Sequence, residues 1–385
     1  MIYLDNAATS KPSANVVRAM VEYLEKDWYN PSSGYRASKT VNEAVEEARA
    51  HVAALIDAEP SEIYFTSGGT ESNNSALFSV HSMLSTEVSM VTSVIEHSAI
   101  LRPMEQIQKQ GRDVSFLPVD EAGSLKVPEE ISAGFVSLMA ANNETGVKQP
   151  LAEIVSRCRD SGCATHTDAV QIVGKERFSV KEVLVDMLSL SGHKFNGPKG
   201  VGALYIRSGF RMSPLLYGGG QESGKRSGTE NVPGIIGMGI AAKEALARID
   251  SASTEIAKMR DAFESEVLRR VSGSELNGDL EQRLSGHSHI SFENCEAEGL
   301  VILLDEYGVQ CSSGSACMTG KQQPSHVQLA MGFSKARAKS SLRFTFSHEN
   351  TMEEALQAAK LVKKAVDKLR SVQNLGTGPV VVYTP

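Results

Sequence analysis

Short apolar runs alternate with segments of helical periodicity through about the first 250 residues, and this alternation restricts the fold more than any other feature. Helical spacing of apolar residues is present over 98–109 and 151–159, for example. Because parallel strands must be joined by crossover connections, usually helices, this order predicts an α/β fold with a mostly parallel sheet covered by helices. The predicted strands are 63–66, 88–94, 135–139, 164–168 and 186–191.

The pattern changes after about residue 250. Longer amphipathic helices are predicted over 253–271 and 352–372, with alternating strands at 290–292 and 342–346 between them. This mixture predicts a smaller α+β domain beside the large one.

We therefore expect a large domain over residues 14–250 and a small domain over 251–385 that also includes residues 1–13. Glycines and a proline interrupt the helical pattern after the last predicted helix, and an extended pattern follows. An edge strand, a docking segment and a mobile end are all compatible with this tail at 376–385.

Composition excludes several classes of function. A net charge of −7 disfavours direct nucleic-acid binding. No apolar run reaches the ~18 residues of a membrane span, and the first residues do not resemble an export signal, so we expect a cytoplasmic protein without a membrane partner. The five cysteines form no Cys-x-x-Cys pair, which fits a reducing compartment. We expect no metal, because His287 and His289 lack evident companion ligands.

A candidate phosphate site follows the first predicted strand. Residues 67–70 read Ser-Gly-Gly-Thr and lead into a predicted helix. Free N–H groups and the dipole at a helix N-terminus favour an anion, and Gly69 and Thr70 would contact it. A tight strand-to-helix turn without a ligand would give the same pattern.

A lysine and an acid lie at the ends of later strands. Lys194 ends an apolar run just before glycines and a proline, a setting that suits a Schiff-base lysine because partial burial favours the neutral, nucleophilic amine. Asp168 ends the preceding strand, at the sheet edge where α/β proteins bind ligands. A phosphate site, an acid and a reactive lysine together match the needs of pyridoxal 5'-phosphate (PLP). The alternatives are a solvated lysine and a helix-capping aspartate.

Two further polar residues follow strands that end at the same edge. His97 lies between a strand and a helix, where its ring can stack on a flat cofactor, although a capping or core histidine fits equally well. Asn143 can donate a hydrogen bond to a ring oxygen, and turn chemistry is the alternative.

Two residues of the second region are candidates for substrate chemistry. Cys317 lies at the end of a loop of small residues, which suits a thiol that must approach a substrate and leave with cargo. Arg343 lies on one face of a predicted strand, where its fork fits a carboxylate, or solvent. We interpret Cys158, Cys163 and Cys295 as packing residues. The role of Cys311 stays open.

The order of these motifs resembles the NifS/IscS-type cysteine desulfurases, which belong to the class V aminotransferase group of fold-type I PLP enzymes. The similarity extends from residue 3 to the last predicted helix. Matching segments are 3–9, 66–73, 96–97, 142–146, 166–171, 191–194, 226–229 and 312–317.

The resemblance implies a role for each matching residue. Lys194 would bind the cofactor aldehyde, Asp168 the pyridine nitrogen and Gln171 the ring hydroxyl, with His97 on the ring face. Asn143, near the ring, and Arg343 would hold the substrate carboxylate. The implied phosphate contacts are Gly69, Thr70, Ser191, His193 and, across a homodimer, Thr229.

The implied reaction removes sulfur from L-cysteine and leaves L-alanine. Lys194 moves a proton from the substrate Cα, His97 carries protons, and the Cys317 thiolate takes the sulfur as a persulfide for an acceptor protein, a scaffold or a sulfur carrier. Iron–sulfur cluster assembly and tRNA thiolation are both compatible destinations. A selenocysteine lyase or an aminotransferase with Cys317 idle, and a catalytically silent docking protein, are the competing interpretations.

Overall fold

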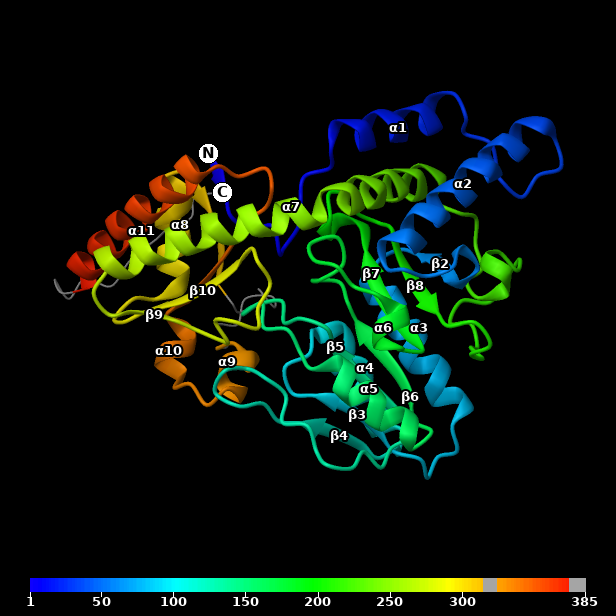
Figure 1. Ribbon diagram of the computed structural model, residues 1–385, viewed down its shortest axis with the longest axis horizontal. Coiled ribbons are helices and arrows are strands. Elements are labelled where there is room, and N and C mark those ends of the chain that lie inside the picture. The colour runs from blue at the N-terminus through cyan, green and yellow to red at the C-terminus, as the bar shows by residue number, and fades with distance from the viewer. Residues whose placement is uncertain (314–323, 374–385) are drawn as a thin grey trace.

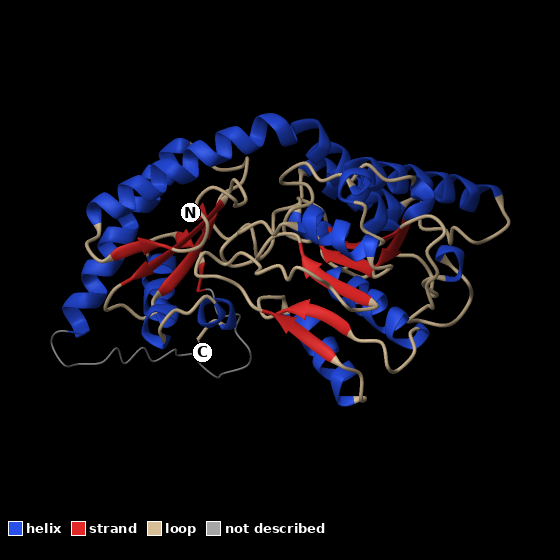
Figure 2. Ribbon diagram, turned by 60° about the horizontal axis from the view of Figure 1, so that its bottom comes forward, coloured by secondary structure: helices blue, strands red, loops and turns tan. Residues whose placement is uncertain are grey.

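The two larger sheets of the protein lie side by side, each with its own helices, and one long helix passes over both (Figures 1 and 2). The structure is a computed structural model that describes residues 1–313 and 324–373. Cys317 and the tail at 376–385, for which the sequence suggested roles, lie outside the described residues.

The larger sheet has seven strands, and β8 runs antiparallel to both of its neighbours while the other paired strands are parallel. This mostly parallel sheet confirms the predicted α/β class. In spatial order the strands are β2 (Ile63–Thr66), β8 (Gly202–Ile206), β7 (Met187–Ser191), β6 (Ala164–Asp168), β5 (Phe135–Met139), β3 (Met90–Ser93) and β4 (Val114–Leu117).

Helices cover both faces of this sheet, which explains why β5, β7 and β8 are mostly apolar and buried along their whole length. One face packs against α3 (Gly69–Met83) and α4 (Ser98–Lys109). The other face packs against α2 (Arg36–Leu55), α5 (Leu151–Asp160) and the first half of α7 (Val232–Arg270). The short α6 (Val180–Val183) precedes β7. No described helix combines the length and the hydropathy that a membrane crossing requires.

The smaller sheet is antiparallel, as expected for an α+β unit. Its core includes Phe263 and Phe344, whose ring centroids lie 4.9 Å apart. In spatial order its strands are β12 (Ser312–Ser313), β13 (Ser341–Thr345), β10 (His287–Phe292) and β9 (Ser274–Leu276). The helices of this half are α8 (Ala297–Glu306), α9 (His326–Ala330), α10 (Lys335–Lys339) and α11 (Met352–Gln373).

The N-terminus joins this smaller half. The strand β1 (Ile2–Tyr3) pairs in parallel with β11 (Val309–Gln310). The chain then passes back along the larger sheet to α1 (Ala14–Glu25), which packs on α7.

The helix α7 (Val232–Arg270) has 39 residues and continues without a break through residue 250, where the sequence suggested a change of domain. It begins well before the predicted start at residue 253. Glycines in its first turns lower helix propensity, but they allow a close approach to α2. A Cβ atom on Gly239 would lie 2.5 Å from the Cα of Ala48, so packing rather than propensity decides this part of the helix.

Candidate active site

A cavity of about 250 Å³ lies at the carboxyl ends of β5, β6 and β7, with the start of α3 and of α4 at its border. This is the position at which open α/β sheets bind ligands. The residues named from the sequence that line it are Gly69, Thr70, His97, Asn143, Asp168, Gln171, Ser191, His193 and Lys194.

The turn between β2 and α3 is built for an anion. Gly68 has φ 153° and ψ −179°, a conformation that is essentially restricted to glycine. The helix begins at Gly69, so the free N–H groups and the positive dipole end of its first turn border the cavity. A Cβ atom on Gly69 would lie 2.8 Å from Val170 Cγ2 and would narrow the cavity, because both residues line it.

Asp168 ends β6 and has a fixed orientation. Its Oδ2 accepts a hydrogen bond from Asn73 Nδ2 at 2.7 Å, and its Oδ1 accepts one from Val170 N at 3.0 Å. The carboxylate is 7% exposed and lines the cavity. It can therefore accept a hydrogen bond from a protonated ring nitrogen in the cavity, as the sequence suggested.

Asn73 is a site residue that the sequence analysis missed. It lies in the first turns of α3, is 1% exposed, and its Oδ1 is buried without a partner among the described residues. An asparagine at this position looks like an ordinary helix residue. The detectable signal was its place three residues after Thr70, on the helix that carries the anion turn.

Lys194 follows β7 in the short helical turn Gly192–Lys194, and its Nζ donates to the carbonyl oxygens of Ala7 at 2.7 Å and Ala8 at 2.8 Å. Burial lowers the pKa of Lys194 to about 8; the charge of Arg343 acts in the same direction, whereas Asp168 and Asp5 oppose it. A sizeable fraction of neutral amine near neutral pH is what a carbonyl-attacking lysine needs.

His97 is both the N-cap of α4 and part of the cavity wall. Its Nδ1 accepts a hydrogen bond from Ala99 N at 3.1 Å, which places the proton of the neutral ring on Nε2. Burial lowers the pKa of His97, and Lys194 acts in the same direction against the opposing charge of Asp168. The capping role that the sequence left as the alternative therefore exists together with the cavity position.

His193 and Ser191 border the cavity on the side of β7. Burial, followed by the charges of Lys194, Lys199 and Lys175, lowers the pKa of His193 to about 4. The ring is therefore neutral at pH 7, and its Nδ1 lies 3.1 Å from Thr9 Oγ1.

Arg343 on β13 reaches across to Asn143, which follows β5 of the larger sheet, but it does not line the cavity. Its Nη1 donates to the carbonyl oxygen of Asn143 at 2.7 Å, and its Nη2 to Asp5 Oδ1 at 2.8 Å. The side chain is 9% exposed, so the solvent-facing alternative is wrong. Its buried Nε has no partner among the described residues. Asp5 was missed, and residue spacing could not reveal a pair 338 residues apart.

The remaining candidates lie elsewhere. Thr229 is exposed and does not line the cavity of its own chain. Cys317 lies outside the described residues. The cysteines that the structure describes are all buried and without a disulfide: Cys158, Cys163, Cys295 and Cys311. Burial raises the pKa of Cys311 far above its usual value.

Within residues 1–313 and 324–373, no three His, Cys, Asp or Glu side chains are placed to hold a metal ion.

The cavity fits a flat ring that carries a phosphate. The anion turn at Gly69, the acceptor Asp168 and the amine of Lys194 border one space, and the unpartnered Oδ1 of Asn73 marks a polar wall. These are the anion site, the ring-nitrogen partner and the aldehyde anchor of PLP.

Comparisons with known proteins agree with this chemistry. The family described as Aminotransferase class-V matches residues 2–357. "Cysteine desulfurase 2" of Trichormus variabilis is 43% identical over 377 residues, which cover 97% of this chain and 94% of that protein. "Cysteine desulfurase IscS" of Methanosarcina thermophila is 41% identical over 381 residues, with 97% and 94% covered. The solved structure of a "NIFS-LIKE PROTEIN" superposes with a TM-score of 0.89 at 34% identity, covering 96% of this chain and all of that one.

Proposed function

The chain belongs to the class-V aminotransferase family, as a PLP-dependent cysteine desulfurase of the NifS/IscS type, and we propose how its residues divide the reaction. The family, the activity and the cofactor that the sequence predicted are thereby confirmed. The structural observation that best supports the assignment is the convergence of the α3 N-terminus, Asp168 and Lys194 on one cavity.

PLP, when bound, supplies an aldehyde that captures amines and a pyridine ring that accepts electrons from the substrate. We assign its phosphate to Gly69, Thr70, Ser191 and His193. We assign the pyridine nitrogen to Asp168, which Asn73 and the backbone N–H of Val170 hold in place. Gln171 would donate to the ring hydroxyl oxygen and His97 would lie against the ring face, since both line the cavity.

Lys194 is the anchoring amine and the base that removes the proton from the substrate Cα. Its lowered pKa, about 8, supports both tasks, because each requires the neutral amine. His97 is placed to relay protons, since its Nδ1 is already occupied and its Nε2 remains for proton exchange.

The substrate carboxylate binds between Asn143 and Arg343. The structure supports this because Asn143 lines the cavity and its carbonyl oxygen accepts from Arg343 Nη1, so the guanidinium lies beside the cavity, where Asp5 is its present carboxylate partner. Because its buried Nε has no partner among the described residues, the guanidinium retains a donor for an arriving carboxylate.

Cys317 accepts the sulfur. Its thiolate attacks the sulfur of L-cysteine, so that an S–S bond forms and the substrate C–S bond breaks with its electron pair left on carbon. Proton transfer to that carbon completes L-alanine, and Cys317 keeps a persulfide. The thiol hydrogens of the substrate and of Cys317 account for the added hydrogen and for the persulfide proton.

We propose that the enzyme is a homodimer. Thr229 is exposed and apart from the cavity of its own chain, so it would complete the phosphate site of a second subunit. Large apolar side chains are exposed along α1 and the glycine-rich stretch before Thr229. They include Val17 (49%), Leu24 (62%), Trp28 (67%) and Tyr217 (81%). Large apolar side chains left exposed at these positions support a subunit contact there.

The persulfide sulfur passes to an acceptor protein, a scaffold or a sulfur carrier. We propose iron–sulfur cluster assembly as its destination, with tRNA thiolation as the alternative, and a cytoplasmic location. The net charge of −7 supports a protein acceptor over direct binding of nucleic acid.

The test is the reaction of the purified protein with L-cysteine. We expect L-alanine in solution and one extra sulfur atom on the peptide that contains Cys317, by mass spectrometry. Cys317→Ser should retain the absorption of bound PLP and lose desulfuration, whereas Cys311→Ser, a change at a buried cysteine, should keep the extra sulfur on Cys317. Continued turnover by Cys317→Ser would contradict the sulfur-acceptor role.

A further inference from the structure

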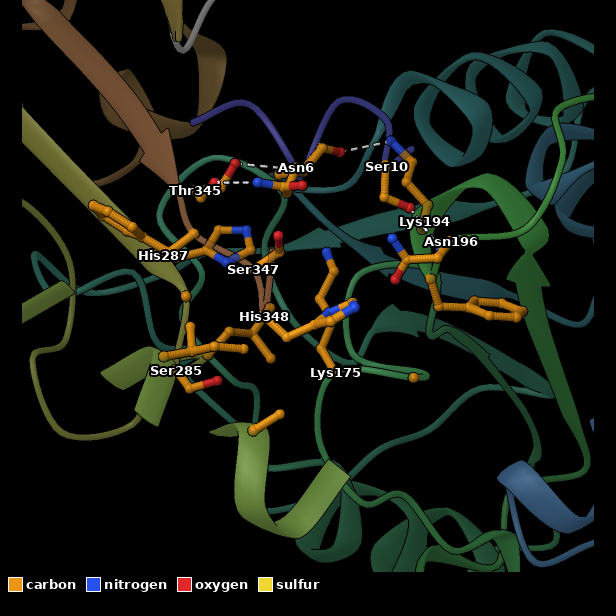
Figure 3. Close-up of a pocket in the computed structure, with 18 of the residues that line it drawn as sticks. Asn6, Ser10, Lys175, Lys194, Asn196, Ser285, His287, Thr345, Ser347 and His348 are labelled. Carbon is orange, nitrogen blue, oxygen red and sulfur yellow. Dashed lines mark hydrogen bonds between the residues drawn. The ribbon is translucent and has the colours of Figure 1, made fainter. Parts of the chain in front are cut away.

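A second, smaller cavity of about 50 Å³ adjoins the cofactor cavity and shares Lys194 with it (Figure 3). Lys175 lines this smaller cavity but not the cofactor cavity. It follows the Asp168–Gln171 segment by four residues, and neither the sequence motifs nor the proposed reaction gives it a role.

The amide of Gln171 has one orientation that its neighbours allow. Its Nε2 donates to the carbonyl oxygen of Ala7 at 3.1 Å, and a carbonyl can only accept. The Oε1 atom must therefore face the other way, where Lys175 Nζ donates to it at 2.8 Å. Gln171 is 6% exposed, so an amide turned the other way would place two acceptors together with little access to water.

Lys175 has no ion-pair partner within the described residues. Its neighbour Glu176 is engaged by Lys148 Nζ at 3.1 Å and by the backbone N–H of Ser285 at 2.8 Å. The contact with Gln171 is the one hydrogen bond that the ammonium group of Lys175 makes among the described residues. Burial lowers the pKa of Lys175, and Lys194 and Arg343 act in the same direction. A half-buried lysine without a carboxylate is costly, so simple ion-pair stabilisation does not explain it.

The same backbone carbonyl links Lys175 to the reactive lysine. Ala7 O accepts from Gln171 Nε2 and also from Lys194 Nζ at 2.7 Å. Gln171 and Lys194 line the cofactor cavity, whereas Lys175 contacts it only through Gln171. The series Lys175, Gln171, Ala7 and Lys194 is therefore a continuous hydrogen-bonded path that ends in the wall of the cofactor cavity.

We propose that Lys175 is a positioning residue that holds the amide oxygen of Gln171 and so directs its NH₂ group toward the ring hydroxyl oxygen of PLP. The inference rests on the proposed cofactor site, and it extends that site to a residue that touches neither cofactor nor substrate. The NH₂ group of Gln171 is then already oriented when PLP binds. No further rotational entropy of this side chain is lost, because its last side-chain bond is already fixed.

The first experiment measures how purified apoprotein binds PLP, by the visible absorption of the bound cofactor. We expect Lys175→Met to weaken PLP binding by about three- to tenfold, the usual worth of one oriented hydrogen bond, and to shift the absorption band. Lys175→Arg keeps a donor and should restore most of both. Lys148→Met is the matched control, because it removes a nearby half-buried ammonium that does not contact Gln171.

The second experiment asks whether Lys175 acts through Gln171. In a Gln171→Ala background, Lys175→Met should cause no further change in PLP affinity or in the absorption band, because the group that it orients is gone. A purely structural lysine would lower the melting temperature and leave the band unchanged.

The proposal is overturned if Lys175→Met leaves affinity and absorption as in the wild type, if Lys148→Met reproduces its effect, or if its effect persists in the Gln171→Ala background. None of these results concerns sulfur transfer. Failure of the proposed function would appear separately, as wild-type protein that binds no PLP or forms no alanine from L-cysteine.

Discussion

The cofactor side and the substrate side of the site are built in different ways. The proposed cofactor residues of one subunit lie between Gly69 and Lys194, at strand ends and helix starts around one sheet. The substrate side depends on Arg343, which belongs to the other sheet and is held by partners 200 and 338 residues away in the chain. The cofactor side therefore follows from the topology of a single sheet. The substrate side forms only where the two larger sheets meet.

The N-terminal segment connects the two sides. Asp5 binds Arg343 and Ser312 Oγ, the latter at 2.8 Å, while Ala7 and Ala8 bind Lys194 through their carbonyl groups. Ser10 Oγ accepts from the backbone N–H of Asn196 at 2.7 Å. The segment of residues 5–10 therefore contacts the smaller sheet through Asp5 and the turn after Lys194 through Ser10.

The largest effect should come from the cofactor side. Lys194→Ala removes both the anchor and the base, so we expect desulfuration to fall by at least about 10³-fold. Lys199→Ala, a change at an exposed lysine five residues away, should leave the rate near that of the wild type. The measurement is alanine formation at saturating L-cysteine, and a small loss in Lys194→Ala would refute its assignment.

A change on the substrate side should act mainly on KM. Arg343→Lys loses the fork that reaches both Asn143 O and Asp5, and we expect kcat/KM to fall by about 10- to 100-fold with PLP absorption unchanged. Asp5→Asn leaves the guanidinium in place and should cost less. If Arg343→Lys lowers kcat and leaves KM unchanged, the residue does not hold the substrate carboxylate.

Glu144 tests the contact between the two halves of the molecule. Its carboxyl is buried and meets Ser325 Oγ at 2.5 Å, and burial raises the pKa of Glu144 to about 7. Between pH 4.5 and 7 the unfolded chain has released this proton, whereas the folded protein still holds it. The free energy of unfolding therefore falls as the pH rises through this range. Glu144→Gln cannot release a proton, so its free energy of unfolding should lack this fall. From pH 5 to pH 8 the variant should therefore gain about 2 kcal/mol in free energy of unfolding relative to the wild type.

Urea unfolding of the holoenzyme at both pH values measures this difference. The same pH dependence in both proteins would show that Glu144 does not titrate in this range. Glu176→Gln is a useful comparison, since Glu176 contacts Lys148 and Ser285 away from Ser325.

The smallest effect is the pH dependence of cofactor capture. With a pKa of about 8, the amine of Lys194 is about one-tenth neutral at pH 7 and about nine-tenths neutral at pH 9. The neutral form attacks the aldehyde, so the rate at which apoprotein captures PLP should rise about tenfold between these values and then level off. A rate that keeps rising to pH 10.5 would mean that burial does not lower this pKa.

The sequence predicted which residues of the cofactor side meet in one cavity, because each step of the inference was local. Strands 135–139 and 164–168 have the predicted bounds, and polar residues after strand ends meet at one sheet edge by topology alone. Asp168 and Lys194 could therefore be placed together without knowledge of any long-range contact.

The features that the sequence did not predict depend on long-range packing or on backbone atoms. The carbonyl groups of Ala7 and Ala8 carry no residue-type signal, and Asp5 finds Arg343 across almost the whole chain. The early start of α7 was missed because glycine has a low helix propensity, whereas the contact of Gly239 with α2 requires a residue without a side chain.

The uninterrupted α7 also limits how this protein can change in length. An insertion of one residue near its middle would turn everything downstream by about 100° and advance it by about 1.5 Å. Arg343 would then be turned away from Asn143, its contact beside the cavity, although the insertion site touches neither residue. We expect insertions to be tolerated in the surface turns of this protein. In α7, which passes over both larger sheets, we expect substitutions to be tolerated better than insertions or deletions.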